Sequence, residues 1–230
     1  MVCAMGLYTS RHPLARFDVV QSLFLAFVRR YCRLRVEGVE HIPTAGAFVL
    51  AANHASHADT AAIFAALPRA LRRRLVAAAA RDYFFDRGLK QFVSRILFNT
   101  IPVARNPTPG EDPLRHVLRA LREGYGVLLY PEGTRSTSGA VGRFRSGIGR
   151  LIAEFPGLPI IPVWIAGTIR VLPKQAVIPF PRPHPIQVRF GVPLRHLRAD
   201  PADKDSWRGA AEQVREAVIQ LGAEAEVHAR

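Results

Sequence analysis

Cysteine is scarce in this chain: its 230 residues include only Cys3 and Cys32. Two cysteines are too few for a disulfide framework, and no metal-binding spacing of cysteine and histidine surrounds either one. We therefore expect a protein of a reducing, cytosolic compartment. The first residues also lack the uninterrupted apolar core of a signal peptide, which agrees with that expectation.

Long apolar runs are missing as well. A helix that crosses a bilayer needs roughly 20 consecutive apolar residues, whereas the run LFLAFV within Phe17 to Tyr31 is short and arginines follow it directly. The apolar residues of this segment recur at helical spacing, with Asp18, Ser22 and arginines on the other face. We predict an N-terminal amphipathic helix that lies on a membrane surface or packs on its own domain.

Acidic residues are outnumbered: 18 Asp and Glu stand against 32 Lys and Arg, which gives a net charge of +14. Such a surplus indicates anionic partners, for example an acidic membrane surface, nucleic acid, an acidic protein or a phosphorylated substrate. The sequence has no interleaved aromatic and basic motif for stacking bases. We therefore expect no nucleic-acid partner.

Several familiar catalytic and nucleotide-binding motifs are absent. Ser146 lacks the first glycine of a nucleophile elbow, and no glycine-rich phosphate loop with Lys and Ser or Thr occurs. The pair Gly147 and Gly149 lacks the third glycine of a dinucleotide fingerprint. Candidate chemistry must therefore come from other residues.

What the sequence does contain is an alternation of short apolar runs and amphipathic stretches. Strands are predicted at residues 48–52, 126–130 and 186–190, and helices at 88–97, 113–122, 144–155 and 206–221. The run 158–165 contains Pro159 and Pro162, which argue against a central, fully paired strand. With 49% hydrophobic residues, the chain predicts a single α/β domain with a mixed, largely parallel sheet flanked by helices.

A polar segment follows the first of these strands. The apolar run ends at Asn53 and His54, and Asp59 stands five residues after the histidine. Side chains at the carboxyl end of such a strand are exposed yet held by a rigid scaffold. Asp59 there is able to accept a hydrogen bond from the imidazole and to stabilise its protonated form. The pair therefore predicts a general base and its orienting carboxylate.

Two further interpretations of the same segment stay open. Ser56 and Asp59 resemble a capping box with Ser56 as the N-cap of a helix, a role compatible with the first. Alternatively, His54, His57 and Asp59 would ligate a metal ion in a hydrolase, but this spacing is not a familiar one. We expect no metal.

A second polar cluster follows the strand at 126–130. It runs from Pro131 to Ser136 and contains Glu132, Gly133, Thr134 and Arg135. Glycine lets a ligand approach the backbone closely, hydroxyls and amides donate to an oxyanion or phosphate, and arginine adds a bidentate charged donor. Arg105, at the end of another short apolar stretch, offers the same kind of donor. A plain turn and a surface arginine are the alternative interpretations.

Four segments together resemble the ordered blocks of the glycerolipid acyltransferases. They are NHASHAD (53–59), TIPVAR (100–105), YPEGTRS (130–136) and LPIIPVWI (158–165). The N-H-x4-D and P-E-G-T-R-S patterns of that family are matched in full, and the similarity is greatest to 1-acylglycerol-3-phosphate acyltransferases. The second block is short and loosely matched, and Arg145 stands where relatives commonly carry lysine.

The resemblance implies roles for particular residues. His54 and Asp59 would be the catalytic pair. The glycerol phosphate of the acceptor would be held by Arg105, Glu132, Gly133, Thr134 and Arg135. The implied reaction moves a fatty acyl group from acyl-CoA or acyl carrier protein to a hydroxyl of 1-acylglycerol-3-phosphate or a related lyso-lipid, in phospholipid biosynthesis. It needs no cofactor besides this donor.

The resemblance also implies an organisation of the chain. Residues 1–35 would form a membrane-associating segment and residues 36–230 the acyltransferase domain. The protein would then be peripheral, on the cytoplasmic face of the cell membrane, where a phospholipid surface presents its acceptor. A non-catalytic module that binds anionic lipid, and the metal-dependent hydrolase, are the alternative functions.

Overall fold

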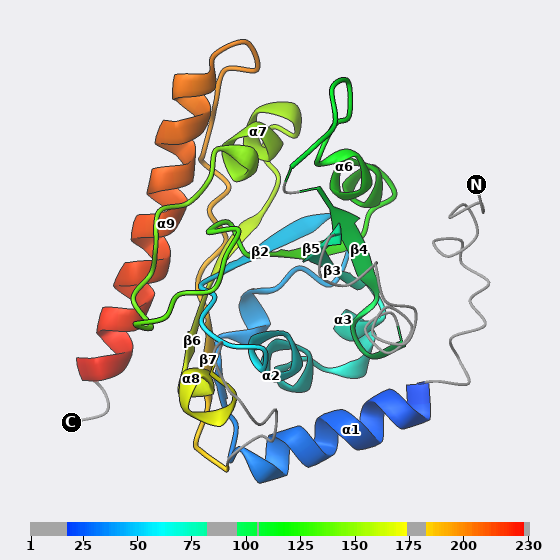
Figure 1. Ribbon diagram of the computed structural model, residues 1–230, viewed down its shortest axis with the longest axis vertical. Coiled ribbons are helices and arrows are strands. Elements are labelled where there is room, and N and C mark those ends of the chain that lie inside the picture. Colours follow the sequence, from blue (N-terminus) through cyan, green and yellow to red (C-terminus); the bar gives the residue numbers. More distant parts are fainter. Residues whose placement is uncertain (1–17, 82–95, 105, 174–182, 228–230) are drawn as a thin grey trace.

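The computed structural model describes residues 18–81, 96–104, 106–173 and 183–227. Within these residues, seven strands form one sheet in the order β1-β7-β6-β2-β5-β3-β4 (Figure 1). The strands are β1 (Arg35–Glu37), β2 (Phe48–Ala52), β3 (Leu75–Ala80), β4 (Thr100–Val103), β5 (Gly126–Leu129), β6 (Ile160–Ala166) and β7 (Gln187–Phe190). Every described pair of neighbours is parallel except β6 and β7. The predicted mixed, largely parallel α/β sheet is confirmed.

Helices cover both faces of this sheet (Figure 1). They are α1 (Asp18–Tyr31), α2 (Asp59–Ala66), α3 (Arg69–Arg72), α6 (Arg115–Arg122), α7 (Gly147–Glu154), α8 (Thr168–Val171) and α9 (Lys204–Val227), with a short 3₁₀ turn at Val39–His41. The predicted helices at 113–122, 144–155 and 206–221 correspond to α6, α7 and α9. The helix predicted at 88–97 lies mostly outside the described residues.

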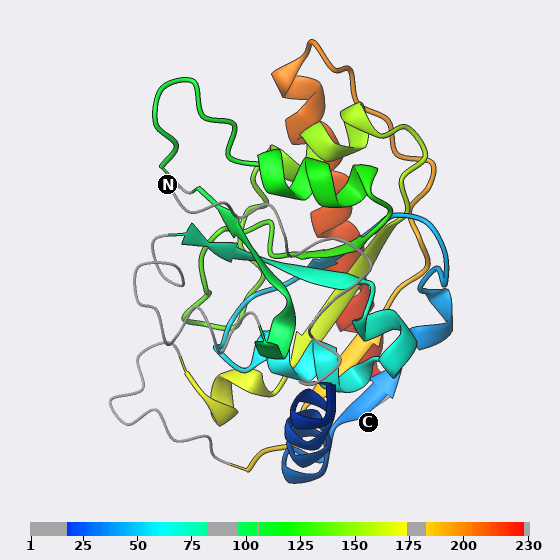
Figure 2. The same ribbon diagram turned by 90° about the vertical axis from the view of Figure 1, so that its right-hand side faces the viewer.

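The central strand β2 is buried on both faces, and its residues alternate between two apolar cores. Phe48 and Leu50 pack with α1, α2 and α3 on one face. Val49 and Ala51 pack with α6, α7 and α9 on the other. Figure 2 shows α6 and α7 above the sheet and α1 at the far end of the molecule. This layering explains why β2 reads as an unbroken apolar run.

The packing of α7 on α9 is unusually close at Gly149. A Cβ atom added to Gly149 would lie 1.9 Å from the backbone oxygen of Trp207 in α9. Only a glycine therefore allows the two helix backbones to approach this closely.

The prediction for residues 158–165 is wrong, because β6 is a central strand. It pairs with β2 on one side and β7 on the other. Pro162 lies in register with Ala51, and its carbonyl accepts a hydrogen bond of 2.8 Å from the N–H of Gly191, just past the end of β7. The ladder between β6 and β7 ends next to this position, at Val163. The missing N–H of Pro162 therefore interrupts neither the pairing of β6 with β2 nor its pairing with β7.

The N-terminal helix has two apolar faces rather than one. Leu25 is buried in the core, and the Asp18 carboxylate forms ion pairs with Arg69, the first residue of α3, and with Arg73, just after that helix. A separate row of apolar side chains is exposed to solvent: Val19, Val20, Leu23 and Phe27. Within the described residues, no helix combines the length and apolar composition that a bilayer crossing requires.

Candidate active site

Register places the two polar clusters side by side. β2 and β5 are parallel neighbours, and Ala51 pairs with Leu129. The chain therefore leaves both strands at the same edge of the sheet, with His54 following β2 and Tyr130 following β5. The sequence-predicted side chains are thus brought together because the carboxyl ends of parallel strands coincide.

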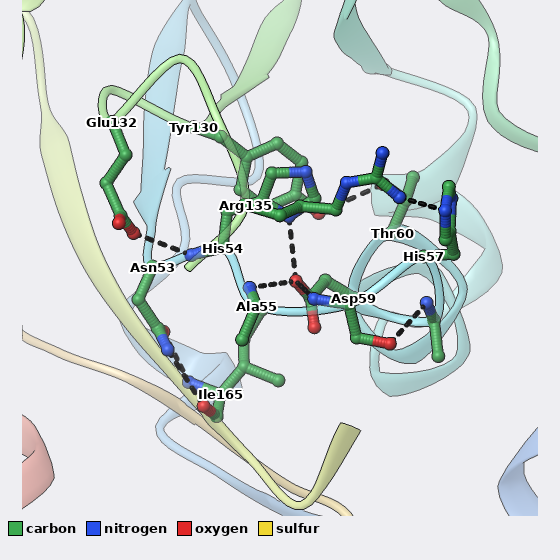
Figure 3. Close-up of polar contacts among 12 residues, drawn as sticks. Asn53, His54, Ala55, His57, Asp59, Thr60, Tyr130, Glu132, Arg135 and Ile165 are labelled. Carbon is green, nitrogen blue, oxygen red and sulfur yellow. Dashed lines mark hydrogen bonds and ion pairs between the residues drawn. The ribbon is translucent and has the colours of Figure 1, made fainter. Parts of the chain in front are cut away.

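His54 and Asp59 form a close hydrogen-bonded pair (Figure 3). The distance from His54 Nδ1 to Asp59 Oδ2 is 2.7 Å. The same Oδ2 atom accepts hydrogen bonds from the backbone N–H groups of Ala55, at 2.8 Å, and Ser56, at 2.9 Å. Because the carboxylate can only accept, Nδ1 carries the proton, and Nε2 of the neutral ring is left as the basic atom. Such an arrangement supports general base chemistry at Nε2.

Burial separates the two members of this pair. The side chain of Asp59 is 1% exposed, whereas that of His54 is 17% exposed. Asp59 is also the first residue of α2, where the helix dipole favours a negative charge. The carboxylate is therefore an internal support, and the imidazole is the member of the pair that is partly exposed.

The capping role of Ser56 is only partly realised. α2 begins at Asp59 with Ala58 at the N-cap position, so Ser56 is not the N-cap. The Ser56 hydroxyl instead accepts from the N–H of Ala58, at 3.0 Å, and donates to the carbonyl of Leu172, at 2.6 Å. The loop between His54 and α2 is thus fixed by a contact within the loop and by one to the end of α8.

Asn53 is a structural contributor that sequence reasoning noted only as part of the motif. Its Nδ2 donates to the Ile165 carbonyl at 2.9 Å, and its Oδ1 accepts from the Ile165 N–H at 2.8 Å. The buried side chain thereby replaces a strand pairing between β2 and β6 and fixes the backbone immediately before His54. Its signal in the sequence is a lone amide at the end of an apolar run.

Glu132 holds the backbone of the site. One carboxylate oxygen accepts from the N–H of His54 at 2.8 Å, and the other accepts from the N–H of Gly142 at 2.9 Å. The residue is buried, and burial raises the pKa of Glu132 above its usual value while these two hydrogen bonds partly offset the rise. The sequence predicted that Glu132 binds the acceptor substrate, but both of its carboxylate oxygens are engaged by backbone N–H groups of the protein.

A cavity of about 510 Å³ adjoins His54. One part of its wall is polar, and the rest is largely apolar, formed by Ala77 to Ala80 of β3, Leu129, Ile148 and Trp207. Successive side chains of β3 lie on opposite faces of the sheet, with Ala77 in one apolar core and Ala78 against the other. Each alanine side chain is small and leaves space where it borders the cavity. The cavity therefore offers room for a hydrocarbon chain next to a basic nitrogen.

Arginines supply the positive charge of the polar wall. Arg135 contacts Nε2 of His57, and the Arg145 side chain lies against Gly133. A Cβ atom added to Gly133 would lie 2.6 Å from Nε of Arg145, and the φ angle of Gly133, +69°, also favours glycine. Sequence reasoning noted Arg145 only as a departure from a family pattern.

The other charged or polar candidates lie differently. Arg150 also lines the cavity, but Asp112 binds its guanidinium through two hydrogen bonds of 2.7 Å. Thr134 is exposed and is not among the residues that line the cavity. Arg105 lies outside the described residues.

The metal-site interpretation finds no geometric support in the described part of the chain, where no three His, Cys, Asp or Glu side chains gather as ligands. His57 faces the cation of Arg135 instead of joining His54 and Asp59. A positively charged neighbour disfavours a bound cation at that nitrogen.

Comparison with known proteins identifies the family. A model of the family described as Acyltransferase matches residues 33–166, which run from just before β1 to the end of β6. The chain belongs to the Acyltransferase family. The matched segment contains His54, Asp59 and the loop after β5.

Curated relatives of this family member include several enzymes named for one reaction. It is 24% identical over 180 residues to the chloroplastic 1-acyl-sn-glycerol-3-phosphate acyltransferase LPAT1 of Arabidopsis thaliana, covering 70% of this chain and 47% of the relative. It is 28% identical over 149 residues to the 1-acyl-sn-glycerol-3-phosphate acyltransferase of Pseudomonas aeruginosa, covering 62% and 52%. Drosophila melanogaster Tafazzin is 27% identical over 184 residues, covering 77% and 48%.

These alignments are partial. The chain spans about half the length, or less, of the curated relatives that it matches. Among solved structures, the 1-acyl-sn-glycerophosphate acyltransferase PlsC of Thermotoga maritima has the same fold, with a TM-score of 0.65 and 23% identity over 94% of this chain and 85% of that chain.

The position of Glu132 leads to a prediction about stability. Glu132→Gln should lower the free energy of unfolding by about 1–3 kcal/mol. In the variant the amide NH₂ replaces one carboxylate oxygen, so one of the two backbone N–H groups loses its hydrogen-bond acceptor. Urea denaturation without any ligand measures this loss. Thr134→Ala, two residues away and exposed, should stay within about 0.5 kcal/mol of the wild type. Equal stability of the two variants would show that the carboxylate is not a support.

Proposed function

We propose that this acyltransferase moves a fatty acyl group from an acyl thioester, either acyl-CoA or acyl carrier protein, to the free hydroxyl of 1-acylglycerol-3-phosphate or a related lyso-lipid. The reaction would be a step of phospholipid biosynthesis. The observation that carries the proposal is the hydrogen-bonded pair of His54 and Asp59 beside a cavity with a basic wall and an apolar wall. The names of the curated relatives support the same substrate class.

The chemistry follows from the orientation of His54. Nε2 removes the proton of the acceptor hydroxyl as its oxygen attacks the thioester carbonyl carbon. The tetrahedral intermediate then collapses, the carbon–sulfur bond breaks, and the thiolate takes the proton back from the imidazolium. Asp59 keeps the ring in the required tautomer and stabilises its positive charge through the 2.7 Å hydrogen bond. Because a thiolate is a good leaving group, no serine or cysteine nucleophile is needed.

The acceptor phosphate would bind at the arginine side of the cavity. Arg135 and Arg145 line it, and Gly133 lets the Arg145 side chain lie directly against the loop because no Cβ atom stands in its place. Guanidinium groups suit phosphate because they donate several hydrogen bonds in one plane. Arg105 and Thr134 remain candidates for the same anion through the family motifs, and we assign Glu132 to the support of this loop.

The donor would place its acyl chain along the apolar wall. The thioester carbonyl then lies near His54, where the apolar and polar walls meet. Both candidate donors are anionic, and the net charge of +14 favours either. No cofactor besides the donor enters this mechanism.

The alternative functions account for less of the geometry. A non-catalytic module that binds anionic lipid requires arginines and an apolar surface, but not a histidine whose Nδ1 proton is held by a buried carboxylate. A metal-dependent hydrolase requires ligands that converge, and His57 instead faces Arg135.

We propose further that the protein acts peripherally, on the cytoplasmic face of the cell membrane. Leu23 and Phe27 on the outer face of α1 are 68% and 57% exposed. The inner face of the same helix contacts the cavity wall, since Phe24 packs edge-on against Phe98, at 6.3 Å between ring centroids, and Phe98 lines the cavity. A helix that touches both a bilayer and the cavity wall would place the site beside its lipid substrates.

The catalytic pair can be tested by substitution. His54→Ala should lower kcat/KM for acyl transfer by about 10²–10⁴-fold, since a positioned base contributes that much, and Asp59→Asn should also lose activity. Thioester consumption, measured across phosphorylated and unphosphorylated acceptors with both donor types, reports the rate. His196→Ala changes an exposed histidine and serves as the control. Full turnover in a folded His54→Ala protein would refute the mechanism. The wild-type rate should fall at low pH, because a protonated imidazole cannot act as a base.

The basic wall can be tested through acceptor affinity. Arg135→Ala and Arg145→Ala should each raise KM for a phosphorylated acceptor by about 10- to 100-fold, because each removes a charge-assisted contact. The KM for the donor should change less. Arg143→Ala is a matched control, since Arg143 is an exposed neighbour that does not line the cavity. If all three variants behave alike, the phosphate binds elsewhere.

The membrane proposal can be tested without disturbing the core. Substituting Leu23 and Phe27 together by serine should weaken sedimentation with anionic liposomes at least about tenfold, because two exposed apolar side chains are lost from the interface. Val192→Ser removes an equally exposed apolar side chain just past β7 and should have no effect. Wild-type binding should weaken in high salt but persist. Unchanged sedimentation of the double variant would place the membrane contact on another surface.

A further inference from the structure

The imidazole of His54 lies face to face with the phenol ring of Tyr130 (Figure 3). The ring centroids are 4.0 Å apart, and the ring planes differ by 19°. The stack covers one face of the imidazole, while its Nδ1 edge is bound to Asp59. His54 is therefore held by an aromatic face in addition to its carboxylate partner.

Tyr130 is itself fixed at both ends. Its backbone directly follows β5, and its hydroxyl forms a hydrogen bond of 3.0 Å with Oγ1 of Thr60. Thr60 follows Asp59 in the first turn of α2. The ring is thus held between the sheet and the helix that presents the carboxylate. Burial raises the pKa of the Tyr130 phenol well above its usual value, and the charge of Asp59 raises it further, so the phenol stays neutral.

We propose that Tyr130 is a positioning residue that stabilises the protonated form of His54 through the face of its ring. A cation beside an aromatic face is attracted by the negative potential of that face, and more strongly where water is excluded. In the proposed reaction, His54 becomes a cation only after it has taken the acceptor proton. The attraction therefore acts on the transition state more than on the free enzyme, which is what raises kcat.

The proposal concerns one contact among several around the histidine. The other titratable and charged groups near His54 come from α2 and its preceding loop, from the loop after β5 and from the segment before α7: Asp59, His57, Glu132, Arg135 and Arg145. A substitution of Tyr130 changes none of these charged and titratable residues. Comparison of an aromatic with a non-aromatic variant at this position therefore isolates the ring.

The first test is a titration that needs no activity. The imidazole signals of His54 are followed by NMR against pH in the full-length wild type, in Tyr130→Phe and in Tyr130→Leu, with His54→Gln used to assign them. The midpoint should move to lower pH in Tyr130→Leu and stay near the wild-type position in Tyr130→Phe. Extra water around the ring in the leucine variant would move the midpoint the opposite way. A midpoint that stays or rises in Tyr130→Leu would overturn the proposal.

The second test is kinetic and rests on the proposed function. Tyr130→Leu should lower kcat by about 2- to 30-fold with little change in either KM, and Tyr130→Phe should restore most of the loss. Tyr125→Leu, at the other end of β5, removes an aromatic ring away from the site and should leave the pH profile unchanged. If Tyr130→Leu does not fold, Tyr130→Met takes its place. Absence of acyl transfer in the wild type would refute the function, whereas the titration would still decide the role of the ring.

Discussion

A single carboxylate oxygen, Oδ2 of Asp59, organises the centre of this molecule. It accepts the Nδ1 proton of His54 and two backbone N–H groups from the loop that joins the histidine to α2. A buried carboxylate is costly unless such donors surround it, and these donors lie close only when the loop takes its observed path. The interaction that prepares the base is therefore also the one that shapes the loop.

The remaining supports of His54 come from distant parts of the sequence. Asn53 connects the chain just before His54 to β6, and Glu132, in the loop after β5, accepts from the backbone N–H of His54. The carbonyl of His54 accepts from the N–H of Ser136 at 2.7 Å. Both backbone groups of the histidine are thus engaged by the second polar cluster, so the loop after β2 and the loop after β5 form one structural unit.

How far the sequence predicts this arrangement depends on how local each signal is. The strand before His54 and the spacing to Asp59 lie within a dozen residues, and periodicity and strand-end chemistry were sufficient to predict them. The roles of Asn53 and Glu132 depend on partners 112 and 78 residues away. Those pairings follow from the order of the strands in the sheet, and the pattern of apolar residues in the sequence does not determine that order. Pro162 was misjudged for the same reason, since the cost of a proline depends on which neighbour its missing N–H would have met.

The contact between Gly149 and the backbone of Trp207 connects the packing of two helices to the shape of the cavity. Trp207 forms part of the cavity wall, yet α9 lies beyond residues 33–166, the segment that the family model matches. The position of that indole depends on how closely α9 approaches α7, and this approach is set at a glycine. One residue of the cavity wall is thus encoded outside the stretch that holds the two polar segments and the rest of the lining. A change in how α9 packs on α7 is therefore able to alter the cavity at Trp207 while every residue of the two polar segments stays the same.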